Sequence, residues 1–355
     1  MRGVPPQTVR FCSAPDGVQI AYAVHGAGPP LLVSTCWFSN LQHDWESPVW
    51  RHFLRDLGRI ATVIRFDERG SGLSDRDVSD FSLEARTGDL EAVADAAGFD
   101  RFALMAMSQG GGPSIRYVVR HPDRITRMLF YGSWAALMPD PTPEDLELNE
   151  AFLQLIKVGY ARPDSTFRRV FTSLMIPAAT EEQMRWLDDL QRTASTAHNT
   201  FRARRALAES DVRELLAHVE VPTLVLHSRG DRNTTFAMGR YLATQIPNAR
   251  LVALESDNHI VLGDEPAWRV FVEEVESFLA PDRSHMPSQR ASVLSHRERE
   301  VIALAARGRS NDDIAADLHL SVRTVERHLH NAYAKLGVSG RSARAAAVSH
   351  VLSSR

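Results

Sequence analysis

Apolar and β-branched runs alternate with helical patterns through residues 1–280 of the chain. Two early runs, Thr8–Ser13 and Val18–Val24, flank the turn tripeptide Pro15-Asp16-Gly17, a pattern that predicts a β-hairpin. Because strands that alternate with helices form βαβ units, we expect an α/β fold with a mostly parallel sheet. The later strands are expected at Leu31–Ser34, Ala61–Phe66, Phe102–Met107, Ile125–Tyr131, Thr223–His227 and Arg250–Leu254.

Helical patterns fill the stretches between these strands, for example Leu83–Ala97 and Ser114–Arg120. One long interval breaks the rhythm, because between Tyr131 and Val221 helical patterns follow each other without a convincing strand. We expect this insertion, over about residues 132–220, to cap the sheet as a helical lid.

Four short helices are expected from Leu294 to the end of the chain. Ser295 is a suitable N-cap for the first, with Glu298 completing a capping box, and the second begins at Ser310. The third runs from Val322 to Leu336, and the fourth follows from Arg341. Two short helices joined by a tight turn are the geometry of helix-turn-helix DNA binding.

The third of these helices is amphipathic. Its apolar residues recur at helical spacing and predict a buried face made by Val325, Leu329, Ala332 and Leu336. The opposite face could enter a major groove, where Arg327 could pair with guanine and Glu326 could accept from cytosine. Arg323 and His330 share that face, and Thr324 and Lys335 suit phosphate contacts at its two ends.

Composition is that of a globular protein of more than one domain, with 355 residues, 44% hydrophobic and 24% charged. The two cysteines, Cys12 and Cys36, exclude a disulfide scaffold and give no zinc-ligand spacing, and we expect no metal or organic cofactor. No apolar signal segment or membrane span is evident, so we expect a protein of the reducing cytoplasm.

A polar segment with two prolines, Ala280–Ser292, reads as a linker. We therefore expect one domain over residues 1–280, a linker over 281–292 and a second domain over 293–355.

The net charge differs between the two ends of the chain. From His285 to Arg355 there are 11 Lys and Arg against 6 Asp and Glu, a net charge of +5, whereas the rest carries −8. A basic tail on an acidic body suggests a polyanion as partner.

Candidate catalytic residues follow three of the predicted strands. Ser108 follows Phe102–Met107 in the sequence Ala106-Met107-Ser108-Gln109-Gly110, close to the G-x-S-x-G pattern of a nucleophile on a sharp strand-to-helix turn. Asp231 and His259 follow two later strands, and the ends of parallel strands meet at one edge of a sheet. Each also has a purely structural alternative: Ser108 as a turn residue, Asp231 as a helix N-cap and His259 as a solvated loop residue. The pair Arg204-Arg205 is expected on the solvated surface.

Residues from about 9 to 280 resemble the α/β-hydrolase superfamily. The resemblance rests on the order Ser, Asp, His, on the Asn258-His259 pair, and on a loop from Asp67 to Ser74 (DERGSGLS) similar to the family's D-x-R-G-x-G-x-S. It implies that His259 takes the proton of Ser108 while Asp231 orients the imidazole. It also implies an oxyanion hole formed by the backbone N–H of Gln109 and one near Trp37, where Ser34-Thr35-Cys36-Trp37 replaces the usual His-Gly.

The segment from Leu294 to Val351 resembles the LuxR-type (NarL/FixJ-type) helix-turn-helix family. The matching stretches are LSHREREVIAL from Leu294, GRSNDDIA from Gly308, LHLSVRTVERH from Leu318 and KLGV from Lys335, with Asp313 in place of the usual Glu. The resemblance implies that Glu326, Arg327 and His330 face the bases of double-stranded DNA. It also implies binding as a homodimer to two-fold sites.

The two halves together predict a transcriptional regulator controlled by a small molecule, an ester or acyl compound, bound over Ser108. We expect ligand to order the lid and to act through the helix Glu265–Leu279 and the linker on dimer geometry. Two alternatives remain open. The first is a catalytically active serine hydrolase that also regulates transcription, and the second is a tail that only mediates protein assembly.

Overall fold

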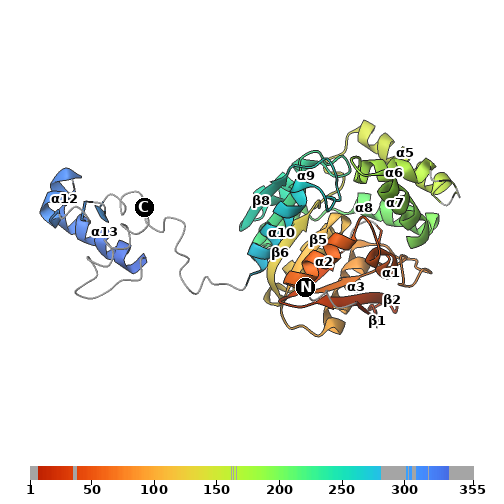
Figure 1. Ribbon diagram of the computed structural model, residues 1–355, viewed down its shortest axis with the longest axis horizontal. Coiled ribbons are helices and arrows are strands. Elements are labelled where there is room, and N and C mark those ends of the chain that lie inside the picture. The colour runs from red at the N-terminus through yellow and green to blue at the C-terminus, as the bar shows by residue number, and fades with distance from the viewer. Residues whose placement is uncertain are drawn as a thin grey trace. The chain divides into compact units, whose positions relative to one another are not determined.

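The structure is a computed structural model that describes residues 7–34, 38–160, 162, 164, 166–280, 301–302, 304–305, 309–318 and 320–335. The chain divides into two compact units, Met1–Ala280 and Pro281–Arg355 (Figure 1). Among the described residues, no helix combines the length and the apolar character needed to cross a membrane.

One eight-stranded sheet organises the described residues of the first unit, with strand order β1-β2-β4-β3-β5-β6-β7-β8. The pairs β1/β2 and β2/β4 are antiparallel and every other neighbouring pair is parallel. The predicted α/β fold with a mostly parallel sheet is therefore confirmed. The strands are β1 (Thr8–Ser13), β2 (Gln19–Gly26), β3 (Pro30–Ser34), β4 (Thr62–Phe66), β5 (Phe102–Met107), β6 (Ile125–Tyr131), β7 (Thr223–Ser228) and β8 (Ala249–Leu254).

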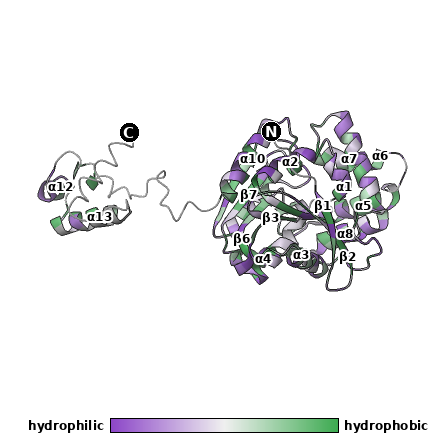
Figure 2. Cartoon of the chain, turned by 60° about the horizontal axis from the view of Figure 1, so that its bottom comes forward, coloured by the Kyte–Doolittle hydropathy of each residue, from purple (hydrophilic) through white to green (hydrophobic). Residues whose placement is uncertain are grey.

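Helices cover both faces of this sheet, as Figure 2 shows, with α2 (Arg51–Ile60) and α10 (Pro266–Leu279) on one face. The opposite face is covered by α3 (Leu83–Ala97), α4 (Gly111–Arg120) and α9 (Phe236–Gln245). Alternate residues of β5 point to opposite faces, so Met105 packs in one core and Leu104 in the other. Because both faces are buried, every residue of β5 is buried, and the strand reads as one apolar run.

The predicted helical insertion between β6 and β7 is confirmed. It contains α5 (Pro143–Gly159), α6 (Thr166–Met175), α7 (Glu181–Ala194), α8 (Ala197–Glu209) and the 3-10 helix η3 (Arg213–His218), and the first four gather at one end of the sheet in Figure 1. Threonine side chains cap three of these helices: Thr142, Thr180 and Thr196 each accept a backbone N–H of the first turn. Such a cap stabilises a helix by about 1 kcal/mol.

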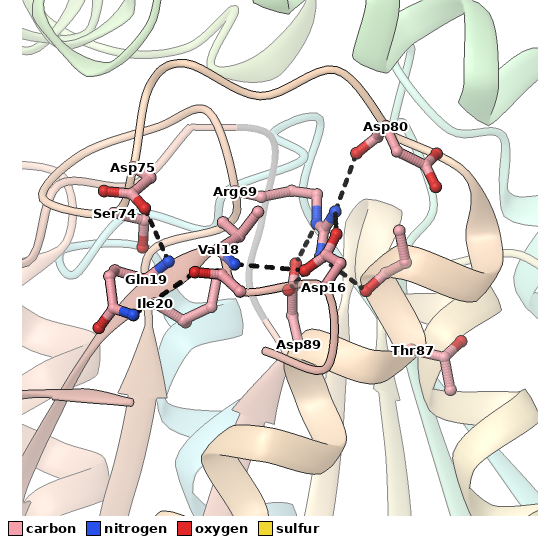
Figure 3. Close-up of polar contacts among 12 residues, drawn as sticks. Asp16, Val18, Gln19, Ile20, Arg69, Ser74, Asp75, Asp80, Thr87 and Asp89 are labelled. Atoms are coloured by element: carbon pink, nitrogen blue, oxygen red, sulfur yellow. Dashed lines mark hydrogen bonds and ion pairs between the residues drawn. The ribbon is translucent and has the colours of Figure 1, made fainter. Parts of the chain in front are cut away.

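A buried arginine fastens the β1–β2 hairpin to the rest of the sheet. The guanidinium of Arg69 donates to Asp89 on α3 at 2.7 Å and to Asp16 in the hairpin turn at 2.7 Å (Figure 3). A second contact joins the backbone N–H of Gln19 to Asp75, at 2.8 Å. The loop from Asp67 to Asp75 therefore has a structural role, because it holds the antiparallel edge of the sheet in register.

In the second unit, α12 (Asn311–Asp317) and α13 (Val322–Lys335) match the expected second and third helices. Ser310 and Asp313 form a capping box on α12. Val325, Leu329 and Ala332 are buried as predicted, in one cluster with Ile314 and Val301. The N-cap Ser295 and its partner Glu298, the fourth helix and Leu336 lie outside the described residues.

Candidate active site on the sheet and candidate DNA-binding helix

Ser108 occupies a sharp turn between β5 and α4. It begins the 3-10 helix η1 (Ser108–Gly110), and its backbone has φ 50°, a value that L-residues rarely adopt. The left-handed conformation costs about 1–2 kcal/mol for a residue with a side chain. The sequence tolerates this turn because small residues follow: a Cβ on Gly110 would lie 2.6 Å from the carbonyl oxygen of Ser34. The strained turn presents the hydroxyl at the carboxyl edge of the sheet.

The structure brings Ser108, His259 and Asp231 into one hydrogen-bonded chain. His259 Nε2 lies 3.0 Å from Ser108 Oγ, and His259 Nδ1 lies 2.6 Å from Asp231 Oδ2. All three residues are buried. In this arrangement a neutral imidazole donates from Nδ1 to the carboxylate and accepts the serine hydroxyl proton at Nε2. The three strand ends thus meet at the geometry expected of a nucleophile, a base and an orienting acid.

The carboxylate of Asp231 is held by a turn that the sequence analysis did not single out. Its Oδ1 accepts the backbone N–H groups of Asn233 and Thr234, each at 2.9 Å, and its Oδ2 accepts the hydroxyl of Thr234 at 2.9 Å. Burial raises the pKa of Asp231, but the neighbouring His259 and these hydrogen bonds outweigh burial and leave the pKa below its ordinary value. Asp231 is therefore ionised at neutral pH, as an orienting acid must be.

A second buried histidine lies beside this carboxylate. His227 Nε2 is 3.7 Å from Asp231 Oδ2 and 2.9 Å from the carbonyl oxygen of Thr234. Burial lowers the pKa of His227, so its imidazole is neutral at neutral pH. Because a neutral His227 does not form an ion pair with Asp231, the carboxylate keeps its negative charge beside His259.

Glycine at position 132 makes room for the imidazole of His259. Gly132 has φ +54°, and a Cβ there would lie 2.9 Å from His259 Cε1 and 3.1 Å from Nδ1. The loop that carries His259 is fixed from its other side, because the Tyr131 hydroxyl donates to the His259 carbonyl at 2.7 Å and accepts the Val261 N–H at 2.8 Å. Glu265 closes the same loop by accepting from the Asn258 side chain at 2.8 Å. Sequence reasoning missed Gly132 and Tyr131, although the Gly that directly follows a predicted strand was a usable signal.

Of the two expected oxyanion-hole donors, the structure describes one. Trp37 lies outside the described residues. Gln109 follows Ser108 in η1, and its side-chain amide donates to Glu68 Oε2 at 2.7 Å. Arg86 donates to the carbonyl oxygen of Gln109 at 3.2 Å and to Glu68 Oε1 at 2.7 Å. These contacts fix the peptide that follows Ser108. The role of the Gln109 N–H as an oxyanion donor stays a prediction.

A cavity of about 630 Å³ opens above Ser108. Its wall is mostly apolar and comes from the lid, from the loops after β6 and β7 and from α9, including Trp134, Met138, Phe152, Phe171, Met175, Leu207 and Met238. Five residues bring charged or amide side chains to the described wall: Asp145, Asn149, Arg204, Arg232 and Asn233. The expectation that Arg204 and Arg205 are both solvated is wrong for Arg204, which has a buried terminal nitrogen, whereas Arg205 is exposed and paired with Glu209. The helical period sends neighbouring residues to different sides of α8.

The candidate DNA-reading residues all lie on α13. By the helical period, Arg323, Arg327 and His330 fall opposite the buried apolar stripe, and Thr324, Glu326 and Lys335 fall on its flanks. Glu326 is exposed, and Thr324 is half-buried with its backbone N–H capped by Ser321. The side chains of Arg323, Arg327, His330 and Lys335 lie outside the described part of the structure. Their assignment to bases and phosphates stays a prediction.

Comparison with known proteins identifies both parts of the chain. Residues 29–266 match the family described as alpha/beta hydrolase fold, so the chain belongs to the α/β-hydrolase family. Residues 292–348 match bacterial regulatory proteins of the luxR family. The chain therefore joins an α/β-hydrolase domain to a C-terminal LuxR-type helix-turn-helix domain, as the two resemblances implied.

Individual relatives agree with the first assignment. The chain is 31% identical over 253 residues to the pimeloyl-(acyl-carrier protein) methyl ester esterase of Neisseria meningitidis, covering 70% of this chain and 73% of the relative. It is 27% identical over 266 residues to a non-heme haloperoxidase of Rhodococcus erythropolis, covering 70% and 92%. Among solved structures, a hydrolase from Pseudomonas aeruginosa has a TM-score of 0.64 at 25% identity, covering 77% of this chain and 99% of that chain.

Proposed function

We propose that the protein is a DNA-binding transcriptional regulator whose α/β-hydrolase domain binds a small molecule that controls it. The observation that carries this proposal is the cavity of about 630 Å³ over Ser108, in a chain that also has a LuxR-type domain. That volume lies within the range of small-molecule sites. Control requires that ligand binds the DNA-competent and DNA-incompetent states with different affinity.

The exposed side of α13 is the proposed reading surface. Arg327 would pair with a guanine edge and Glu326 with the amino group of cytosine, and Arg323 and His330 would contact neighbouring bases or phosphates. Thr324 and Lys335 would hold the backbone at the two ends of the helix. We further propose that the protein binds a two-fold site as a homodimer, because a helix-turn-helix protein reads such a site with two copies of one helix. We place the protein in the cytoplasm.

A second candidate function is serine hydrolysis, favoured by the hydrogen-bonded chain from Ser108 to Asp231. In the first step, Ser108 Oγ attacks the carbonyl carbon of an ester while its proton passes to His259 Nε2. The leaving alcohol takes that proton as the C–O bond breaks, and an acyl group stays on Ser108. Water then attacks the acyl carbon and gives a proton to His259, and the acid leaves as the bond to Ser108 Oγ breaks and His259 returns that proton to Oγ. The esterase relative supports an ester or acyl compound as ligand.

Salt dependence of DNA affinity tests the regulator. The DNA fragments for this test come from genome-wide footprinting of the full chain. Fluorescence anisotropy then measures the affinity of the full chain for each fragment from 50 to 200 mM salt. Affinity should fall steeply, because phosphate contacts release counterions. Arg327→Ala should lower sequence preference by about 1–3 kcal/mol, whereas Lys335→Ala should weaken binding to all sequences alike. Affinity that is independent of salt would instead favour a tail that only mediates assembly.

Release of p-nitrophenol from p-nitrophenyl esters tests the hydrolase. Wild type should turn over or give a stoichiometric burst, and Ser108→Ala should fall to the background rate of free solution. The Ser13→Ala variant is a control that should keep the wild-type rate, since the exposed Ser13 hydroxyl accepts from the Gln19 side chain in the β1–β2 hairpin and lies outside the proton relay. Equal rates in wild type and Ser108→Ala would remove the enzyme assignment and leave the regulator intact.

A further inference from the structure

Arg204 brings an unpaired positive charge to the wall of the cavity. Its side chain forms no hydrogen bond or ion pair among the described residues, and its Nη1 atom is buried without a partner. Its guanidinium carbon lies 6.0 Å from the ring centre of Phe152, another wall residue. A desolvated cation without an acceptor is costly, because it loses water without gaining a hydrogen bond.

No acidic side chain of the described cavity wall forms an ion pair with Arg204. Asp145, the acidic residue of the described wall, is committed to the N-terminus of α5, where it accepts the backbone N–H and the hydroxyl of Thr142. Asn149 lies one turn before Phe152 on α5, and its buried Oδ1 also has no partner. Rotation of the Asn149 amide would place its NH₂ group where the oxygen now stands. Helices α5 and α8 therefore present two polar groups that lack partners in the described structure.

We infer that Arg204 recognises a carboxylate, so that the ligand is an acyl compound with a carbonyl at Ser108 and an acid at its far end. This inference rests on the proposed ligand-binding function of the cavity. The planar guanidinium matches a carboxylate with two parallel hydrogen bonds. An apolar wall between Ser108 and Arg204 suits the methylene chain that joins the two ends.

The electrostatics of the site agree with an anionic ligand. Burial lowers the pKa of Arg204 to about 10, which still leaves the guanidinium charged at neutral pH. A carboxylate would restore the interaction that burial removes. Arg232 also reaches the wall, but it is exposed and remains solvated without a ligand. One buried cation matches the single charge of a carboxylate better than the double charge of a phosphate.

Half-esters and diesters of one dicarboxylic acid test this inference directly. The probes are the monomethyl and dimethyl esters of hexanedioic, octanedioic and decanedioic acid, which differ only in the charge at one end. Isothermal titration uses the full chain with Ser108→Ala, so that binding is measured without turnover. For at least one chain length, the half-ester should bind at least tenfold more tightly than its diester.

Three further variants, each combined with Ser108→Ala, assign that preference to a residue. Arg204→Gln should abolish it, and Arg204→Lys should keep part of it because the charge remains. The matched control is Arg205→Gln, the next residue on α8, which is exposed and paired with Glu209 at 3.2 Å and should leave the preference unchanged. A preference that survives Arg204→Gln would overturn the inference.

The remaining outcomes separate the inference from the proposed function. Equal binding of half-ester and diester would overturn the acid-recognising role of Arg204 while the cavity keeps its proposed role. If no probe binds, both the ligand-binding role of the cavity and the inference fail. Thermal unfolding without ligand gives a second readout: Arg204→Met should raise the Tm by a few degrees, because an unpaired buried charge is removed. A lower Tm would show that Arg204 serves the fold instead.

Discussion

At the residue scale, two left-handed backbone positions decide the geometry around Ser108. Ser108 has φ 50°, which presents its hydroxyl at the sheet edge. Gly132 has φ +54°, and only glycine leaves room there for the imidazole of His259. Backbone strain of this kind persists only where surrounding contacts hold it. At Ser108 the contact is the Ser133 hydroxyl, which donates to the Ser108 carbonyl at 2.6 Å.

Gly132→Ala should separate alignment from stability. The new Cβ would press on His259 and shift it from Ser108, so labelling of Ser108 by a fluorophosphonate should slow about 10²-fold. Gly98→Ala is the matched control, since Gly98 also has positive φ, at +73°, but has nothing within 4 Å of its Cβ position. Both variants should lose about 1–2 kcal/mol of stability. Equal labelling rates in the two would contradict the role given to Gly132.

Two buried histidines away from the site should make stability depend on pH. His25 Nε2 lies 3.0 Å from the Leu54 carbonyl, and His52 Nε2 lies 2.9 Å from that of Val261. Burial lowers the pKa of each to about 4, against about 6.5 in the unfolded chain. The stability that depends on neutral imidazoles is therefore present above pH 6.5 and is lost as pH falls towards 4. Each imidazole contributes about 2–3 kcal/mol.

Urea unfolding at pH 7 and pH 4.5 checks this effect. All six tryptophans precede residue 281, so their fluorescence reports the first unit alone. The double variant His25→Gln, His52→Gln should lose less stability than wild type on acidification, and the exposed His198→Gln should behave as wild type. Asp44, whose pKa burial raises to about 7, titrates in the opposite sense in every variant, so the comparison cancels it. Parallel losses in wild type and double variant would contradict the assignment.

At the scale of elements, periodicity and caps in the sequence located most helices and strands. The runs Phe102–Met107 and Ile125–Tyr131 appear as β5 and β6 with the expected bounds, and Leu83–Ala97 appears as α3. Such elements are readable because their pattern and their capping groups lie within a few residues of each other. The short run Leu31–Ser34 was equally readable, since a strand buried on both faces is mostly apolar, here Leu31, Leu32 and Val33.

The capping box of α12 should control local opening of the DNA-binding domain. Ser310→Ala removes the hydroxyl that accepts the Asp313 N–H at 3.2 Å, at a cost of about 1 kcal/mol. Amides of Ile314 to Asp317 in the full chain should then exchange about fivefold faster by mass spectrometry. Asp312→Ala is the control, because this exposed residue of the first turn takes no part in the box. Unchanged exchange in Ser310→Ala would show that α12 is held by tertiary packing alone.

At the scale of the whole molecule, the functional question is whether an occupied cavity changes DNA affinity. A fluorophosphonate that reacts with Ser108 fills the cavity covalently and removes any ambiguity about occupancy. Treated wild type should differ from untreated wild type in operator affinity by about fivefold or more, the usual range of coupling between two sites. Ser108→Ala treated in the same way is the control. Equal affinity with full labelling would leave two independent domains in one chain.

The fold and the three members of the hydrogen-bonded chain could be predicted, whereas their support could not. Ser108, Asp231 and His259 each follow a strand, and strand ends meet at one sheet edge by topology alone. Tyr131 was missed because its partners, His259 and Val261, lie far away in sequence. Arg204 was misplaced because its surroundings come from α5, far away in sequence.

The sequence by itself determined the order of the elements, the two-domain composition and the buried stripe of α13, because these follow from spacing and capping along the chain. Tertiary structure alone decided the distances between Ser108, His259 and Asp231, the cavity above them and the burial of the Arg204 Nη1 atom. The physical reason is range. Periodicity is set by neighbours a few residues apart, whereas close packing and desolvation depend on segments that meet only when the chain has folded.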